Sequence, residues 1–401
     1  MQTLPSRISS LHALRGFAAL VVVIYHWPLL LKEQITNRAF LPADQPFNSL
    51  LWPCYAHGFR AVELFFALSG FIFFWLYGEK VAGGAIQARE FFVRRFSRLY
   101  PLHFATLWFV LGIKGFLRWN YADNSMCNVN DNLPHFLLQL VFASNWYGES
   151  QWTGWTFNVP IWSVSVECLL YAMFFVICAL RLQKMWVLLA LAFGGCLLGS
   201  TGLDLVGRGM ISFFLGGCAF HVLCFLQEKR IVIRPALAAG CLVGVWVLAI
   251  LIMTYFPPYP FYRSVFGDRL LLRGHDVVGA VLLFVSGKLF ELIVFPASIL
   301  LLAIIEKTKE GFCEWFSFLG DLSYSLYLLH FPLLLVFYTV TKVTGIDGGL
   351  FYSPVAFLGY LAILFPLSWA SYHYWESPMQ TRLRKFFHAG AAQEPVAAPV
   401  R

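Results

Sequence analysis

The sequence predicts an all-α membrane protein, a polytopic helical bundle of about ten transmembrane helices with one short re-entrant or interfacial segment. Hydrophobic residues make up 59% of the 401 residues and charged residues only 12%, whereas soluble domains average about 45–50% and 25%. The apolar runs have about the twenty residues that a helix needs to cross a bilayer, and they lack the alternating polarity of membrane β-strands. This composition excludes a soluble enzyme, a disordered chain and a nucleic-acid-binding module.

The expected spans follow the apolar stretches in chain order, at 11–31, 58–78, 98–117, 160–180, 185–203, 208–226, 234–256, 283–305, 322–343 and 354–376. The first has no small-residue cleavage site after it, so we expect a retained helix and not a signal peptide. The apolar segment 135–146 is too short to cross the membrane, so it is the expected re-entrant or interfacial segment. The membrane domain is expected over 1–388. Residues 389–401 are rich in Ala and Pro and are expected to form a disordered cytoplasmic tail.

The distribution of Lys and Arg predicts the orientation. With ten spans and a cytoplasmic N-terminus, 18 of the 29 basic residues fall inside, 10 fall outside, and Lys288 lies in a span. Because inner loops carry the excess of basic residues, both termini are expected in the cytoplasm. The expected location is a bacterial-type inner or plasma membrane. Cys54 and Cys127 fall in predicted outer loops, where pairing is one alternative and two free thiols the other.

Arg15 and His26 are the first ionisable residues in a predicted span. Because an ionisable group inside a membrane is costly, each is a candidate functional residue. They are eleven residues apart, which places them on one helix face about 16 Å apart along the axis. A snorkelling Arg and an unrelated structural His are the alternative. An imidazole near the middle of the membrane is also suited to general base catalysis.

Three arginines, Arg94, Arg95 and Arg98, cluster at the inner end of the third predicted span. Arg95 and Arg98 are three residues apart and therefore share a helix face. Guanidinium groups at that spacing suit phosphate recognition. The alternative is a basic anchor of the kind that many inner loops carry. Arg15 is expected in the same leaflet, so these arginines predict an anion site below His26.

Glu167 and His330 are two further polar groups in predicted spans, and Tyr171 lies one turn after Glu167. A carboxylate at that depth must be protonated, hydrogen-bonded or paired. Glu167 is thus either a catalytic group that orients an imidazole or acceptor, or part of a structural ion pair. His330 is a second intramembrane imidazole, directly before a Phe-Pro pair. No group of His or Cys residues has convincing metal-ligand spacing, so no metal is expected.

Six segments, read together, resemble the membrane acyltransferase-3 family, and they occur in the family's order between residues 11 and 378: LHALRGFAALVVVIYHW, AVELFFALSGF, FFVRRFSRLYP, WSVSVECLLY, LGDLSYSLYLLHFP and WESP. The family's Arg/Lys-x10-His pattern falls on Arg15 and His26, and its Arg-x-x-Arg pattern falls on Arg95 and Arg98. Its Trp-Ser-…-Glu pattern falls on Trp162, Ser163 and Glu167.

The resemblance implies an integral-membrane O-acyltransferase that moves an acyl group, commonly acetyl from acetyl-CoA, to a hydroxyl acceptor. The acceptor is commonly a cell-envelope or exported carbohydrate. The expected roles are catalysis by His26 and Glu167, donor binding by Arg15, Arg94, Arg95 and Arg98, and substrate binding by Tyr171, Trp162 and His330. Membrane lipid is an expected partner and nucleic acid is not. A transporter or flippase for an anionic solute or a lipid-linked sugar, with a proton relay of these groups, is the alternative; the oligomeric state stays open.

Overall fold

The computed structural model describes residues 8–126, 130–146, 156–198, 202–255 and 287–388. Over these residues the chain is α-helical with no strand, which confirms the predicted fold class. Eight helices in this part of the chain are long and apolar enough to cross a membrane, and α9 is a shorter apolar helix. Each of the ten predicted spans overlaps a helix, and their number stays a prediction. The predicted disordered tail and Cys127 lie outside the described residues.

The helices run in the order α1 (Ser9–His26), α2 (Glu33–Thr36), α3 (Asn48–His57), α4 (Ala61–Phe73), α5 (Glu79–Ala82), α6 (Ala88–Tyr121), α7 (Leu133–Leu140), α8 (Ile161–Ala179), α9 (Met185–Leu198), α10 (Asp204–Glu228), α11 (Pro235–Tyr255), α14 (Phe295–Thr308), α15 (Ser317–Thr344), α16 (Pro354–Ala370) and α17 (Ser377–His388). Single π-helical turns over Phe74–Gly78, Phe290–Val294 and Ser371–Glu376 interrupt the long spans. The predicted short segment forms α7, whose eight residues are too few to cross a membrane.

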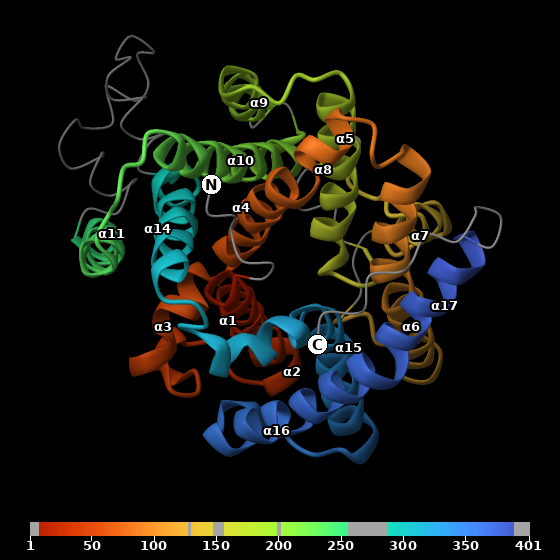
Figure 1. The fold of residues 1–401 in the computed structure, drawn as a ribbon. Helices are drawn as coiled ribbons and strands as arrows, with labels where there is room; N and C mark the ends of the chain where they lie inside the picture. Colours follow the sequence, from red (N-terminus) through yellow and green to blue (C-terminus); the bar gives the residue numbers. More distant parts are fainter. Residues whose placement is uncertain (1–7, 127–129, 147–155, 199–201, 256–286, 389–401) are drawn as a thin grey trace, which may run out of the picture.

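Helix α1 lies in the middle of the bundle with α4, α14 and α15 around it, while α9 and α11 lie at the periphery (Figure 1). Glycines allow the closest helix approaches. A methyl group at Gly16 of α1 would overlap Leu319 of α15, and one at Gly216 of α10 would overlap the Ala67 carbonyl of α4. Such small-residue crossings are the usual way for membrane helices to pack tightly. The pairing of α1 with α15 places their polar side chains against each other.

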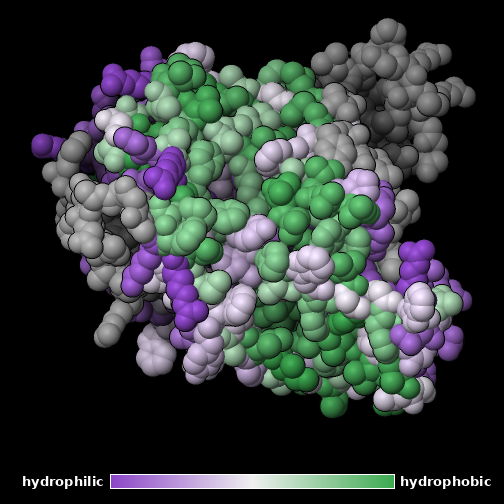
Figure 2. Space-filling model, turned by 90° about the vertical axis from the view of Figure 1, so that its right-hand side faces the viewer, coloured by the Kyte–Doolittle hydropathy of each residue, from purple (hydrophilic) through white to green (hydrophobic). Residues whose placement is uncertain are grey.

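The surface agrees with a membrane location. Figure 2 shows a broad hydrophobic area between hydrophilic residues gathered at opposite sides of the molecule. Many large apolar side chains are exposed in the peripheral helices, among them Trp186 of α9 at 65% and Val243 of α11 at 62%. A soluble monomer does not expose contiguous apolar area on this scale, so the exposed band is the expected lipid-facing surface.

Candidate active site

Two histidines from opposite ends of the chain meet inside the bundle. His26 ends α1 and His330 lies in the middle of α15, and His330 Nε2 is 3.2 Å from His26 Nδ1. The ring centroids are 4.8 Å apart. His330 has no exposed surface, whereas His26 is half-buried. The two predicted intramembrane imidazoles therefore form one unit, of which only His26 reaches open space.

The hydrogen bonds of this pair define a tautomer for each neutral ring. His330 Nδ1 lies 2.7 Å from the carbonyl oxygen of Tyr327, so this nitrogen donates and Nε2 is left as an acceptor. His26 Nδ1 lies 2.9 Å from the carbonyl oxygen of Val22 as well as beside His330 Nε2, and both neighbours accept. His26 Nδ1 therefore carries the proton, which leaves a lone pair on His26 Nε2.

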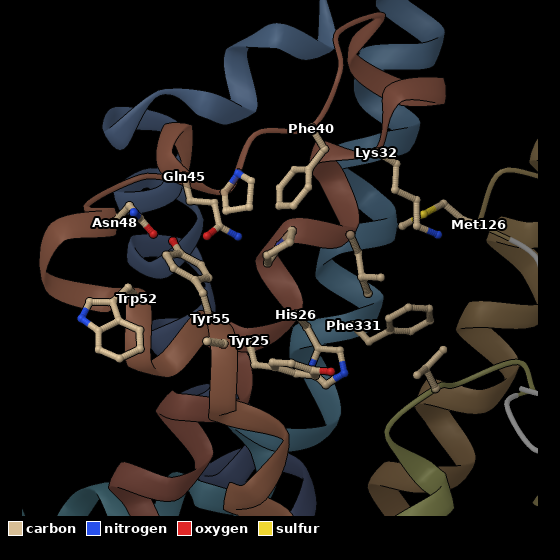
Figure 3. Close-up of a pocket in the computed structure, with 15 residues that line it drawn as sticks. Tyr25, His26, Lys32, Phe40, Gln45, Asn48, Trp52, Tyr55, Met126 and Phe331 are labelled. Carbon is tan, nitrogen blue, oxygen red and sulfur yellow. The ribbon is translucent and has the colours of Figure 1, made fainter. Parts of the chain in front are cut away.

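His26 lines a cavity of about 600 Å³ between α1, α3 and the segment that joins them. Figure 3 shows His26 with Tyr25 and Phe331 beside it and with Phe40, Gln45 and Lys32 on other sides of the cavity. The full lining is Tyr25, His26, Pro28, Leu29, Lys32, Phe40, Pro42, Gln45, Asn48, Trp52, Tyr55, Ala56, Met126, Val159 and Phe331. Aromatic rings with a few amides and one ammonium group are typical of a site for a polar organic ligand.

Lys32 is the one charged residue of this lining, and its ammonium group has no carboxylate partner among the described residues. Burial lowers the pKa of Lys32, and the positive charge of Lys114 lowers this pKa further. Lys114 itself is paired with Asp131, at 2.8 Å. The cavity next to His26 therefore has a positive side.

Near the other end of α1, the predicted arginines do come together. The strongest charged neighbours of Arg15 include Arg98, Glu167 and Arg95. The guanidinium groups of Arg15 and Arg98 make no hydrogen bond or ion pair with any described residue. Arg95 donates to the Tyr77 hydroxyl and lies 4.7 Å from the ring centroids of Phe73 and Tyr77, but its buried Nε has no partner. These groups retain unused donors, as an anion site requires.

Glu167 belongs to this arginine cluster and not to the histidine pair. Its Oε1 accepts hydrogen bonds from Ser69 at 2.7 Å and from Tyr171 at 2.5 Å. Tyr171 stacks on Phe73 with ring centroids 4.4 Å apart. The imidazole of His26 is oriented by His330, and no hydrogen bond joins Glu167 to His26 among the described residues. The catalytic role of Glu167 and the substrate contact of Tyr171 stay predictions.

Two other predicted site residues lie apart from the histidine pair. Arg94 forms an ion pair with Glu90 one turn earlier in α6. Trp162 lies under the guanidinium group of Arg208, 5.5 Å from the ring centroid, and it is not part of the lining of the cavity beside His26. Arg208 in turn pairs with the fully buried Glu63. The structure therefore does not bring Arg94 or Trp162 to the histidine pair.

Several polar residues of the site were not singled out in the sequence. Ser69 binds Glu167. Ser163 belongs to the Trp-Ser-…-Glu pattern, but its contact with the Tyr327 hydroxyl, at 2.6 Å, was not predicted. Arg384 of α17 has Arg94, Arg95 and Arg98 among its strongest charged neighbours. Serines and a basic terminal segment are common in membrane proteins, so only the helix packing identifies them. The described residues contain no group of three or more His, Cys, Asp or Glu side chains placed to hold a metal ion.

Comparison with known proteins identifies the family. The family model named for acyltransferase-3, with the description "Acyltransferase domain", matches residues 8–373. The chain belongs to the acyltransferase-3 family. This confirms the resemblance seen in the sequence, and the match includes the histidine pair and the clustered residues Arg15, Arg95, Arg98 and Glu167.

Two curated relatives match parts of the chain. "Acyltransferase MdmB" of Streptomyces mycarofaciens is 32% identical over 170 residues, which are 42% of this chain and 38% of that protein. "Protein 2 in picA locus" of Rhizobium radiobacter is 39% identical over 106 residues, 26% of this chain and 45% of that protein. The alignments thus span less than half the length of either relative. No solved structure matches the chain.

Proposed function

We propose that this protein is an integral-membrane O-acyltransferase that takes an acyl group, acetyl in the simplest case, from a cytoplasmic acyl-CoA donor. The acceptor is a hydroxyl compound, with a cell-envelope or exported carbohydrate as the favoured class. Both termini face the cytoplasm of a bacterial-type inner membrane. The observation that carries the proposal is the position of His26, on a helix that has the arginine cluster near its other end and with a ligand-sized cavity beside His26.

The donor fits the arginine cluster because CoA is a polyanion. Arg15 and Arg98 have unused guanidinium donors, and the buried Nε of Arg95 lacks a partner. Arg15 and His26 are eleven residues apart on one helix, so about 16 Å separates them along the axis. An extended pantetheine arm bridges a distance of this order, which brings a thioester at its end near His26. Arg94 supports the donor site only through its charge, since Glu90 is its direct partner.

His26 is the proposed general base. Its Nε2 accepts the proton of the acceptor hydroxyl while the hydroxyl oxygen attacks the thioester carbonyl carbon. The carbon–sulfur bond then breaks, and the leaving thiolate takes the proton from the His26 imidazolium. His330 is a positioning residue: its Nε2 accepts the hydrogen bond from His26 Nδ1 and thereby stabilises the imidazolium form. The products are the acylated acceptor and free CoA thiol, and His26 returns to its neutral form.

Glu167 is proposed to act in the donor half. Its carboxylate lies within electrostatic range of Arg15, and it is held by the hydroxyls of Ser69 and Tyr171. In that position it keeps the guanidinium group of Arg15 in place beside the donor's path. Tyr171 and Trp162 are proposed substrate contacts by family resemblance alone.

The cavity beside His26 is the proposed acceptor site. Trp52 and Tyr55 offer ring faces, while Gln45, Asn48 and Lys32 offer donors and acceptors for hydroxyl or charged groups. This combination suits a carbohydrate, whose apolar faces stack on aromatic rings while its hydroxyls bond to amides. An acceptor of this chemistry leaves one hydroxyl beside His26 Nε2.

The purified protein in lipid nanodiscs, incubated with acetyl-CoA labelled in the acetyl group, tests the proposal. We expect slow acetyl-CoA hydrolysis without acceptor, and label transfer when a crude envelope glycan fraction is added. The His26→Ala variant should show neither. Movement of a solute into sealed proteoliposomes that contain the protein, without acetyl-CoA turnover, would instead support the transporter alternative and contradict an acyltransferase.

A further inference from the structure

Helix α17 begins after the π-helical turn Ser371–Glu376 and lies beyond the part of the chain that the family model matches. It packs along the beginning of α6 (Figure 1). Arg89 of α6 donates to the Phe387 carbonyl oxygen at 2.8 Å, and the Phe96 and Phe387 rings have centroids 6.4 Å apart. These contacts fix α17 over the end of the arginine cluster that is farther from His26.

Arg384 is the residue of α17 that faces this cluster. It is half-buried, and its Nε donates to the buried hydroxyl of Ser97 at 3.4 Å. It has no carboxylate partner among the described residues. Arg382, two residues before Arg384, and Lys385, directly after it, are exposed. The helix therefore presents one basic group inward and others to the surroundings.

The charges around Arg384 are not balanced. Arg15, Arg95, Arg98 and Arg384 lie near two carboxylates, Glu167 and Glu376. Both carboxylates already accept hydrogen bonds from hydroxyl groups, Glu167 from Ser69 and Tyr171, and Glu376 from Ser325 and Ser371. Four guanidinium groups beside two occupied carboxylates leave an excess of positive charge, which a bound anion neutralises.

The arginines are arranged in sequence from the interior to the surface. Arg15, the deepest, has Arg98 and Glu167 as its strongest charged neighbours. Arg384, which lies on α17 against the beginning of α6, has Arg94 and Arg95 as its strongest. In a CoA molecule the pyrophosphate lies between the pantetheine arm and the nucleoside, and the ribose 3′-phosphate lies farthest from the thioester. This order matches the order of the arginines.

We propose that Arg384, held by Ser97, binds the ribose 3′-phosphate of the CoA donor, so that α17 forms the outer wall of the donor site. The inference rests on the proposed function, because it takes CoA as the donor. A phosphomonoester could also come from a lipid headgroup. The inward position of Arg384 favours the nucleotide, whereas the exposed Arg382 and Lys385 are the residues placed to meet headgroups.

Calorimetric titration of the detergent-purified full chain with CoA and with 3′-dephospho-CoA tests the proposal. In the wild type, CoA should bind more tightly than dephospho-CoA by about tenfold to a hundredfold, as expected for a hydrogen-bonded charge. Arg384→Gln should weaken CoA binding by this factor and leave dephospho-CoA binding unchanged. Arg384→Lys should fall between, because it keeps the charge and loses the planar fork. Arg382→Gln, on the same helix, should bind both ligands as the wild type does.

Other binding results would overturn either the CoA donor or the role of Arg384 alone. If the wild type binds neither ligand, the CoA donor of the proposed function is wrong, and this inference fails with it. If the wild type binds CoA but Arg384→Gln keeps the wild-type preference for CoA over dephospho-CoA, or loses affinity for both ligands by the same factor, only the role of Arg384 is overturned. The same conclusion follows if Arg382→Gln loses as much CoA affinity as Arg384→Gln. It also follows if added phosphatidylglycerol abolishes the difference in CoA affinity between the wild type and Arg384→Gln. Should Arg384→Gln not fold, the Arg384→Lys variant gives the same comparison.

Discussion

His330 Nε2 lies 3.2 Å from His26 Nδ1, and this contact joins residues that are 304 positions apart in the sequence. The partner of the catalytic candidate is therefore a second imidazole and not a carboxylate. A neutral imidazole stabilises an imidazolium less than a carboxylate does, but it carries no charge that must be desolvated inside the membrane. The arrangement suits a general base that must be neutral at rest and charged only during the reaction.

The first prediction concerns His26. His26→Ala should lower acyl transfer by about 10²–10⁴-fold, the range typical of a general acid–base group, while CoA still binds. The measurement is release of CoA thiol from acetyl-CoA, with a separate titration of CoA affinity. His373→Ala is the matched control, since His373 is an exposed imidazole in the chain. Turnover of His26→Ala close to that of the control would remove His26 from the mechanism.

The second prediction concerns His330. His330→Phe keeps the ring volume and removes one of the two acceptors of His26 Nδ1, leaving the Val22 carbonyl oxygen. We expect kcat to fall by about ten- to a hundredfold, the loss of a hydrogen bond to a charged group. The KM for the donor should not change. His330→Gln, which retains an acceptor, should recover part of the loss. Because the two residues act as a unit, His26→Ala with His330→Phe should be no slower than His26→Ala alone. Additive losses would show two independent roles.

How much of this site the sequence predicts depends on whether the contact is local. Arg15 and His26 share a helix, so their common face follows from the helical repeat alone. The contact between His26 and His330 depends on the packing of α1 against α15, which the periodicity of either helix does not encode. Similarly, Trp52 and Tyr55 of the cavity resemble interfacial aromatic residues in sequence, and Arg384 resembles a positive-inside anchor.

The third prediction separates phosphate binding from a general basic surface. Arg98→Lys keeps the charge but loses the guanidinium fork, so the KM for acetyl-CoA should rise by roughly ten- to a hundredfold. The same exchange at the exposed Arg382 should have little effect. Steady-state kinetics over a range of acetyl-CoA concentrations gives both values. Equal and small effects at the two positions would place the phosphate site elsewhere.

The fourth prediction concerns the packing of α4 against α10. A methyl group at Gly216 would overlap the carbonyl oxygen of Ala67, so Gly216→Ala should destabilise the fold by about 1–3 kcal/mol, as overpacking does. Gly240→Ala in α11 is the control, because no atom lies within 4 Å of its added methyl group. The measurement is the unfolding temperature of each variant in detergent, compared with that of the wild type. An unchanged value for Gly216→Ala, or an equal loss for both variants, would contradict the close helix crossing.

The fifth prediction concerns pH and the residue that ties the end of α6 to α15. Asp123 accepts hydrogen bonds from the Tyr338 hydroxyl, from Lys342 at 2.9 Å and from the Ser125 amide at 2.8 Å. Burial by itself raises the pKa of Asp123, but these hydrogen bonds outweigh it and hold the pKa well below its ordinary value. Since the folded pKa lies below the unfolded pKa of about 3.9, the stabilisation is complete above that pH and is lost as pH falls through the folded pKa.

Asp123→Asn should therefore lower the unfolding temperature by the same amount at every pH between roughly 5 and 8, where the wild-type carboxylate is ionised in both states. Below about pH 4 the difference in unfolding temperature between the wild type and Asp123→Asn should shrink, because unfolded wild type then binds a proton at Asp123 that the folded chain does not. Asp44→Asn serves as the control, since Asp44 pairs with the exposed Arg38 and such pairs contribute about 0–1 kcal/mol. Thermal unfolding across this pH range decides the matter. A gap between wild type and Asp123→Asn that widens as the pH falls toward 4 would reverse the sign and refute the assignment of Asp123 as an ionised anchor.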